Sequence, residues 1–301
     1  MRVLIIGCGY VGTPLATRLQ ALGHEVWGLR RSDGPHLDLL EVGVTPLVGD
    51  ITQAESIATS LHGLTFDAIV NATSSRGGGE EGYEQLYLRG TQRVLEHFKS
   101  TPPQCYVHLS STSVYGQTSG EVVTEDSPAL PTNATSRVLV ATEQWLLDSV
   151  HDPRTRVVIL RSAGIYGPER GHLFLKFIRG EATLTGDGDR WLNMIHREDV
   201  VSSIIGALGD QEQKCSGILN LADDAPVQER TFYAWLATEL NRPMPPSIDP
   251  STRVKKRGDT NKRVMNGKLK EICLPILQFP SFREGYRAEI QRLGLSGSCH
   301  P

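Results

Sequence analysis

The sequence lacks long apolar runs and has no excess of charge of one sign. Its apolar stretches are short, such as residues 3–6, whereas a helix that crosses a bilayer needs about 20 apolar residues. Lys and Arg number 31 and Asp and Glu 34, so the net charge of -3 gives no general attraction for nucleic-acid phosphates. We therefore expect a small-molecule substrate as the partner, with no nucleic acid and no membrane.

Cysteine is also scarce. Five cysteines occur with no C-x-x-C pair and no metal-ligand spacing, and an odd number argues against a disulfide framework. The apolar residues of the first expected strand begin at Val3, which leaves no room for a secretory signal before them. These features predict reduced thiols, no metal and a cytoplasmic location. We interpret Cys8 as a small residue that fills a tight turn, with a redox role as the alternative.

The remaining composition is that of a globular protein. The 301 residues, 39% hydrophobic and 22% charged, predict one large or two modest domains. Short apolar segments alternate with helical patterns, which is typical of βαβ units. We predict an α/β fold, a Rossmann-type doubly wound parallel sheet with helices on both faces. The expected strands are residues 3–7, 25–29, 44–48, 68–71, 106–109 and 157–160.

The strand–helix alternation weakens from Glu169 onward, where Gly186-Asp187-Gly188 indicates a turn and prolines gather between residues 243 and 250. We expect a smaller C-terminal substrate lobe at the carboxyl edge of the sheet. The expected division gives an NAD(P)-binding domain to residues 1–168, with 196–220 returning to it. The lobe then takes 169–195 and 221–295, and 296–301 form a tail.

A glycine turn follows the first expected strand. In Gly7-Cys8-Gly9-Tyr10-Val11-Gly12, Gly7 permits the tight turn, Gly9 leaves room for a pyrophosphate and Gly12 lets helix and strand approach. The start of the following helix offers free N–H groups, including those of Tyr10 and Val11, to an anion. This spacing, directly after an apolar strand, predicts dinucleotide binding.

The end of the second strand indicates which dinucleotide binds. An NAD site usually has Asp or Glu there, whereas this chain has Arg30 and Arg31, whose guanidinium groups suit a 2′-phosphate. We therefore predict NADP, with NAD as the alternative if Asp33 holds the ribose instead. Asp50, followed by Ile51, is expected to meet the adenine or to be an ordinary turn residue.

Several ordered segments resemble the extended short-chain dehydrogenase/reductase superfamily, in its NAD(P)-dependent epimerase/dehydratase branch. They are the glycine turn and residues 48–50, 109–116, 160–168 and 193–200. The resemblance implies that Ser111 hydrogen-bonds the reacting oxygen, and that Ala72, Thr73 and Arg161 help to complete the cofactor pocket. Thr112 and Ser113 stand where sugar-nucleotide dehydratases carry an acid and a base, which disfavours dehydration.

The chain departs from that family at its Tyr-x-x-x-Lys pair. Counted back from Glu143, the pair falls at Thr135 and Leu139, and neither side chain exchanges a proton near neutral pH. This resembles the atypical members that lack the pair. General acid–base catalysis contributes about 10²–10⁴ in rate, so another group would have to replace it. The candidates to replace it are Tyr87, Tyr115, Arg137 and His196, with Thr135 retained as a candidate catalytic residue.

The substrate lobe offers further candidates. The resemblance places Asn193 and His196 beside the substrate, and Arg263 where relatives contact a diphosphate; a solvated charge run is the alternative for Arg263. The expected function is an NAD(P)-dependent oxidoreductase or epimerase/dehydratase-like enzyme for a carbonyl or sugar-type, nucleotide-linked small molecule. The alternative is a catalytically degenerate NADP-binding sensor. By resemblance, a homodimer would pair through residues 87–98 and 138–150.

Overall fold

A computed structural model describes residues 1–31, 37–75, 77–150, 152–209, 215–249 and 260–295. Some expectations lie outside these residues. They concern Asp33, most of the basic run (Arg253, Lys255, Lys256 and Arg257), Cys299 and the tail.

A seven-stranded parallel sheet organises the chain; the parallel Rossmann-type sheet was predicted, whereas its seventh strand was not. Its order is β12-β7-β5-β4-β1-β2-β3, and every neighbouring pair is parallel. The order in which the chain adds strands reverses between β1 and β4, and ligands of such sheets bind at the carboxyl ends of the strands at that point. The strands are β1 (Arg2–Ile6), β2 (Glu25–Arg30), β3 (Thr45–Val48), β4 (Ala68–Asn71), β5 (Cys105–Ser111), β7 (Arg156–Ser162) and β12 (Gly217–Leu221).

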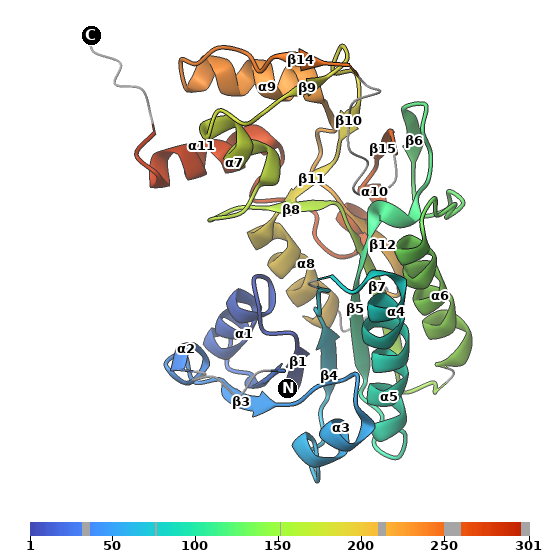
Figure 1. Ribbon diagram of the computed structural model, residues 1–301. Coiled ribbons are helices and arrows are strands. Elements are labelled where there is room, and N and C mark those ends of the chain that lie inside the picture. The colour runs from blue at the N-terminus through green and yellow to red at the C-terminus, as the bar shows by residue number, and fades with distance from the viewer. Residues whose placement is uncertain (32–36, 76, 151, 210–214, 250–259, 296–301) are drawn as a thin grey trace.

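Helices cover both faces of this sheet. Figure 1 shows α1 and α8 on one side and α4, α5 and α6 on the other. The first set is α1 (Gly12–Ala21) and α8 (Arg197–Gly209), with the short α2 (Leu37–Leu40) beside α1 and β3. The second set is α3 (Ala54–Ser60), α4 (Gly79–Tyr83), the π-helix η1 (Glu84–Arg89), α5 (Gly90–His97) and α6 (Ala134–Ser149).

Alternation along the strands explains the two layers. Val3 and Ile5 of β1 pack in a core that includes Leu15 of α1, whereas Leu4 and Ile6 pack in another that includes Val94 of α5. Successive side chains of a strand point to opposite faces, so a fully apolar strand fills two cores at once. This packing is the physical reason for the unbroken apolar runs in the sequence.

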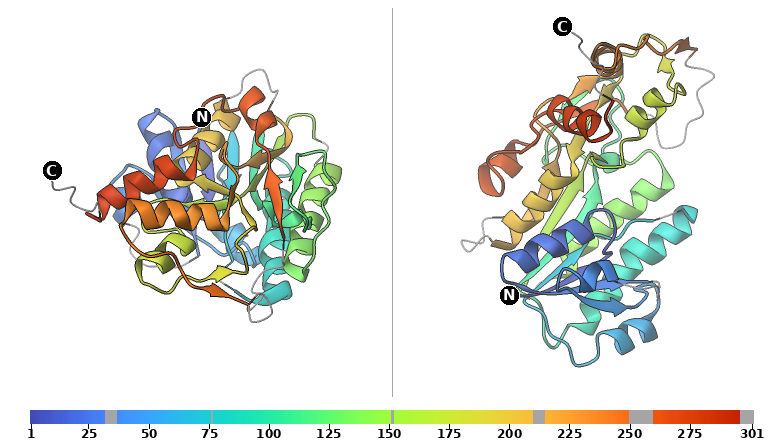
Figure 2. Two further views of the ribbon diagram at one scale, coloured as in Figure 1. Left: turned by 90° about the horizontal axis from the view of Figure 1, so that it is seen from above. Right: turned by 90° about the vertical axis from the view of Figure 1, so that its left-hand side faces the viewer.

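A second group of elements lies beyond the carboxyl edge of the sheet. In Figure 1 and in the right-hand view of Figure 2, the orange-to-red C-terminal helices lie above the sheet. Their aromatic core is separate and includes Phe174, Phe232, Phe282 and Tyr286. The helices around it are α7 (His172–Ile178), α9 (Glu229–Glu239) and α11 (Phe282–Arg292). The short α10 (Gly267–Ile272) packs instead against β12, and its Leu269 belongs to the core that contains Val3.

Short strands connect this group to the sheet and to itself. The pairs are β8 (Gly164–Tyr166) with β11 (Met194–His196), β9 (Leu184–Thr185) with β14 (Ser247–Ile248), β10 (Trp191–Leu192) with β13 (Val227–Gln228), and β6 (Glu121–Val123) with β15 (Lys262–Val264). The β6–β15 pair joins a segment that follows β5 to a segment near the C-terminus. It therefore brings C-terminal residues next to the end of β5.

Within the described ranges, no helix combines the length and the apolar character that a membrane crossing requires. The same residues contain no cluster of His, Cys, Asp and Glu able to hold a metal ion, and the four described cysteines form no disulfide bond with one another.

Candidate active site

The glycine turn has the shape that a dinucleotide needs. Gly7 has a φ of +91°, and a Cβ there would come within 2.9 Å of the Ala72 backbone. A Cβ on Gly12 would collide with the carbonyl oxygen of Gly7. A Cβ on Gly9, in contrast, would meet nothing within 4 Å, so the space above Gly9 is open. The turn is closed where the backbones must touch and open where a pyrophosphate would lie.

The start of α1 is available to an anion. Val11 is the N-cap residue, and its side chain makes no capping hydrogen bond. First-turn N–H groups without a cap, together with the helix dipole, attract negative charge. The neighbouring Tyr10 ring lies 4.8 Å from the Arg170 guanidinium and 5.0 Å from that of Arg197. These residues fit a dinucleotide diphosphate at this turn.

Arg30 is only partly free for a phosphate. Its Nε donates to the Cys8 carbonyl oxygen at 2.7 Å, and its two Nη atoms donate to Asp38 at 2.8 and 2.5 Å. Arg30 therefore supports the glycine turn and shares its charge with a carboxylate. Arg31, at the end of β2, is exposed.

Asp50 stabilises a local turn. Its Oδ1 accepts hydrogen bonds from Thr52 N at 2.9 Å and Thr52 Oγ1 at 2.7 Å, and the Ile51 side chain is buried. Asp50 therefore acts here as a turn residue, which was the alternative to a contact with the adenine. Thr73 also folds back, since its hydroxyl donates to Asn71 Oδ1 at 2.8 Å, while Ala72 N donates to the Ile6 carbonyl oxygen. Ala72 and Thr73 follow β4, beside Gly7.

Hydroxyl groups meet at the end of β5. Ser111 Oγ accepts a hydrogen bond from Ser113 N at 3.2 Å, and Ser113 Oγ accepts one from Ser136 Oγ at 3.2 Å. Asn133 caps α6, and its Oδ1 accepts from Ser136 N at 2.9 Å and from Thr135 Oγ1 at 2.8 Å. The structure therefore brings residues 111–115, which we call the Ser111 turn, next to the start of α6.

The other candidates for proton transfer have different surroundings. Leu139 is buried in the core beneath α6, and Arg137 is exposed on that helix. Tyr87 is buried on η1, where its hydroxyl oxygen accepts a hydrogen bond from Ser75 N at 3.1 Å. Tyr87 thus holds the loop that follows β4. Thr112 is buried within its turn.

Arg161 lies beneath the site, which corrects its expected place in the cofactor pocket. Its guanidinium group donates to both carboxylate oxygens of Glu143, at 2.6 to 3.2 Å, and to Tyr115 Oη at 2.8 Å. Arg161 is 4% exposed and Glu143 2%, so this ion pair is enclosed between the sheet and α6. Tyr115 Oη also donates to Asn220 Oδ1. Tyr115 therefore belongs to a buried network.

His196 is a buried aromatic partner, in line with a structural histidine rather than a proton-transfer group. Its ring lies 3.7 Å from that of Phe279 and 5.2 Å from that of Tyr166. Burial lowers the pKa of His196 to about 4, and its Nδ1 accepts a hydrogen bond from Glu198 N. His196 is therefore neutral at pH 7.

Asn193 and Arg263 hold the strand β15 in place. Asn193 Nδ2 donates to the Lys262 carbonyl oxygen at 2.9 Å, and Asn193 Oδ1 accepts from Val264 N at 2.7 Å. Arg263 Nε donates to the Gly120 carbonyl oxygen at 3.0 Å, and its guanidinium lies 5.1 Å from the Trp191 ring centre. Asn193 thus fixes the backbone of β15, and Arg263 connects β15 to the loop before β6.

Lys262 is the residue near this site whose burial the sequence did not reveal. It stands in a basic run beside Arg263, and the run suggested solvated charges, yet Lys262 is 4% exposed. The available signal was the alternation in Lys262-Arg263-Val264, in which Lys262 and Val264 share a face of the strand. The burial of Val264 then places Lys262 on the inner face as well.

Comparisons with known proteins agree with this geometry. Protein YeeZ of Escherichia coli K12 is 31% identical over 247 residues, which are 79% of this chain and 84% of YeeZ. The 3-diazoavenalumate denitrifying reductase of a Streptomyces species is 24% identical over 269 residues, 82% of this chain and 84% of that protein. The Bacillus cereus UDP-glucuronic acid 4-epimerase structure, in complex with UDP-glucuronic acid and NAD, shares the fold, with a TM-score of 0.79 and 18% identity over 97% of this chain and 100% of that one.

A family model covers most of the chain as well. The model described as the NAD dependent epimerase/dehydratase family matches residues 3–222, from the first strand to the end of the seven-stranded sheet. The matched segment contains the glycine turn, the Ser111 turn and α6. The chain belongs to the NAD-dependent epimerase/dehydratase family, with the NAD-binding Rossmann fold of that family.

Proposed function

We propose that the protein is an NADP-preferring oxidoreductase or epimerase-like enzyme that acts on a carbonyl or sugar-type small molecule at Ser111. The observation that carries the proposal is the shared position of two features at the carboxyl edge of the sheet. One is the glycine turn, with open space above Gly9, and the other is the hydroxyl group of Ser111. The dinucleotide, when bound, supplies or accepts a hydride.

The residues of this chain orient the reacting oxygen. Ser111 Oγ accepts its hydrogen bond from a backbone N–H, so its own proton is available to the substrate oxygen. Ser136 donates to Ser113, and Asn133 holds both Ser136 N and Thr135 Oγ1. We expect this hydroxyl cluster, without a Tyr-Lys pair at positions 135 and 139, to position the substrate and to donate a hydrogen bond to its reacting oxygen.

Relatives support an enzyme more than a sensor. One carries the name of a reductase, and the Bacillus cereus epimerase was solved with UDP-glucuronic acid and NAD. Nucleotide-linked sugars and small ketones are therefore the substrate classes to examine first. The preference for NADP over NAD rests on Arg30 and Arg31 at the end of β2.

A Ser111→Ala variant tests the role of the hydroxyl group. A panel of ketones and UDP-sugars is screened with NADPH and NADP⁺ by nicotinamide absorbance, and dinucleotide affinity is measured by calorimetry. We expect loss of the hydroxyl to lower turnover by about 10²-fold or more, because such a donor acts mainly in the transition state, with dinucleotide affinity unchanged. The exposed Ser100→Ala is the control. Absence of dinucleotide binding to the wild-type protein would refute the proposal.

We also propose a homodimer through α5 and α6. A cavity of about 490 Å³ opens on this outer face, far from the glycine turn, and its lining includes Arg93 and His97 of α5 and Trp145 of α6. A second copy would cover this face. Light scattering over a range of concentrations tests the proposal, and a single monomeric mass throughout would contradict it.

A further inference from the structure

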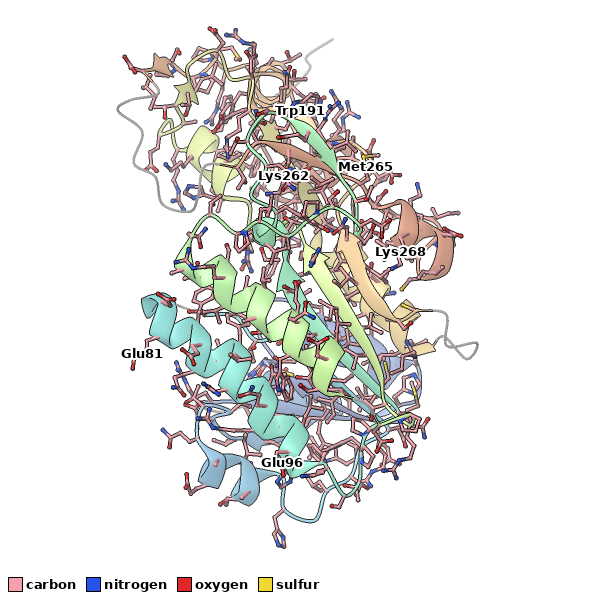
Figure 3. All side chains as sticks on the ribbon, turned by 90° about the vertical axis from the view of Figure 1, so that its right-hand side faces the viewer. Glu81, Glu96, Trp191, Lys262, Met265 and Lys268 are labelled. Atoms are coloured by element: carbon pink, nitrogen blue, oxygen red, sulfur yellow. The ribbon has the colours of Figure 1, made fainter. Side chains whose placement is uncertain are left out.

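A buried lysine lies where the lobe strands meet the Ser111 turn. The Lys262 ammonium donates to the Tyr115 carbonyl oxygen at 2.7 Å and to Thr260 Oγ1 at 3.0 Å, and the residue is 4% exposed. Figure 3 shows Lys262 between the helices beside the sheet and the lobe above them, near Trp191. Both acceptors are uncharged, so neither balances the positive charge.

The carboxylates of the neighbouring elements are engaged elsewhere. Glu121, the register partner of Lys262 on β6, accepts a hydrogen bond from Ser119 N at 2.8 Å. Glu125, just beyond β6, accepts one from Asn220 N at 2.7 Å. Among the described residues, no carboxylate forms an ion pair with Lys262, and the next charge on its strand, Arg263, is also positive.

Such a position disfavours the charged form of a lysine. Burial lowers the pKa of Lys262 to about 8, so the side chain is still mostly protonated at pH 7. A buried ammonium without an anion costs free energy that a neutral side chain of similar length would avoid. The chain therefore maintains a positive charge here that the described protein groups do not neutralise.

The position is also firmly built. Asn193 holds the backbone of β15 on both sides of Arg263, and β6 pairs with β15 in parallel register. Lys262 and Val264 point inward together and are both buried. An ammonium carries three N–H donors, and the two hydrogen bonds of Lys262 leave one for a ligand.

We propose that Lys262 binds an anionic group of the substrate, a carboxylate or a phosphate, beside the Ser111 turn. The proposal rests on the proposed function, because it assigns a charged end to the same substrate whose carbonyl or hydroxyl oxygen meets Ser111. Tyr115, whose carbonyl oxygen holds the ammonium, ends the turn that Ser111 begins. A charge-assisted hydrogen bond in this enclosed place would select anionic substrates over neutral ones.

Calorimetry with simple anions tests the proposal without knowledge of the substrate. Sodium phosphate and sodium acetate are titrated separately into the full chain with saturating NADP⁺, so that the glycine turn is occupied. The variants are Lys262→Met, Lys262→Arg and Lys268→Met, where Lys268 is an exposed lysine of α10 and serves as the control (Figure 3). The better ligand of the two anions identifies the group as phosphate or carboxylate.

We expect saturable binding of at least one anion to the wild-type protein and at least tenfold weaker binding to Lys262→Met. Lys262→Arg should retain most of the affinity and Lys268→Met all of it. Acetate keeps its charge between pH 7 and 9, so acetate affinity should fall above pH 8 as Lys262 loses its proton. This pH series uses the wild-type protein and decides the matter if Lys262→Met does not fold.

Three results would overturn the proposal. They are no binding of either anion to the wild-type protein, wild-type affinity in Lys262→Met, and an anion affinity that is independent of pH from 7 to 9. Dinucleotide affinity is measured on the same samples. Loss of dinucleotide binding alone would contradict the proposed function, whereas unchanged anion binding in Lys262→Met would contradict only the role of Lys262.

Discussion

At the scale of single residues, the same side-chain type serves different purposes depending on its partner. Arg161 gives its donors to Glu143 and Tyr115 beneath the sheet edge, whereas Arg30 divides its donors between the Cys8 carbonyl oxygen and Asp38. Lys262 has only uncharged acceptors among the described residues. Partners that distant segments supply thus decide whether a cation supports the fold or remains available to a ligand.

Arg31 and Asp38 test the predicted NADP preference. A hydrogen bond to a charged group contributes about 1.5–3 kcal/mol, so Arg31→Gln should weaken NADP⁺ binding by roughly tenfold or more and leave NAD⁺ binding unchanged. Asp38→Asn removes the carboxylate that pairs with Arg30 and should strengthen NADP⁺ binding several-fold. Calorimetric titration of both dinucleotides measures these effects, with the exposed Lys99→Gln as control. Equal losses for NAD⁺ and NADP⁺ in Arg31→Gln would contradict a contact with the 2′-phosphate.

At the scale of elements, local sequence patterns predicted the parts of the fold that local forces determine. The six predicted strands are present within one or two residues, because most of them are apolar runs that fill the cores on both faces of the sheet. The exception is β3 at the sheet edge, where Thr45 and Val48 are exposed. Gly7 ends the first of them at Ile6, since its φ of +91° leaves the strand conformation. The parallel order and the helices on both faces are also confirmed.

Non-local contacts account for what the sequence did not predict. The strands β9, β10, β13 and β14 have two residues each, and so short a segment carries no readable alternation. The ion-pair partner of Arg161 is Glu143 on α6. The acceptor of the Lys262 ammonium is Tyr115 in the Ser111 turn, which is far from Lys262 in the sequence. The glycine turn and Ser111 were predictable because each depends on one segment, whereas the roles of Arg161 and Lys262 depend on which segments the fold brings together.

At the scale of the whole molecule, two buried histidines connect stability to pH. His108, in the middle of β5, is 1% exposed, and neither ring nitrogen has a hydrogen-bond partner among the described residues. Burial lowers the pKa of His108 to about 4, as it does for His196. Protonation of either ring would place a charge in a core, so the folded state excludes a proton that the unfolded chain accepts.

The free energy of unfolding should therefore depend on pH between about 6.5 and 4. An unfolded histidine has a pKa near 6.5, so the contribution of His108 is complete above that pH and is lost as the pH falls toward 4. At about 1.4 kcal/mol per pKa unit, the full difference corresponds to roughly 3 kcal/mol. His108→Leu removes the titrating ring at similar volume and should reduce the pH dependence by about that amount. Urea unfolding at several pH values measures it, with the exposed His62→Gln as control. An unchanged pH profile in His108→Leu would show that His108 does not contribute.

The pairing of β6 with β15 also has a consequence for the order in which the protein is made. By Leu221 a growing chain has every strand of the seven-stranded sheet, including the glycine turn and the end of β5. Lys262 and its strand are translated later, and only then do they reach the Ser111 turn. Since domains fold as their N-terminal parts leave the ribosome, the nascent chain can complete the seven-stranded sheet and its glycine turn before Lys262 contacts the Ser111 turn.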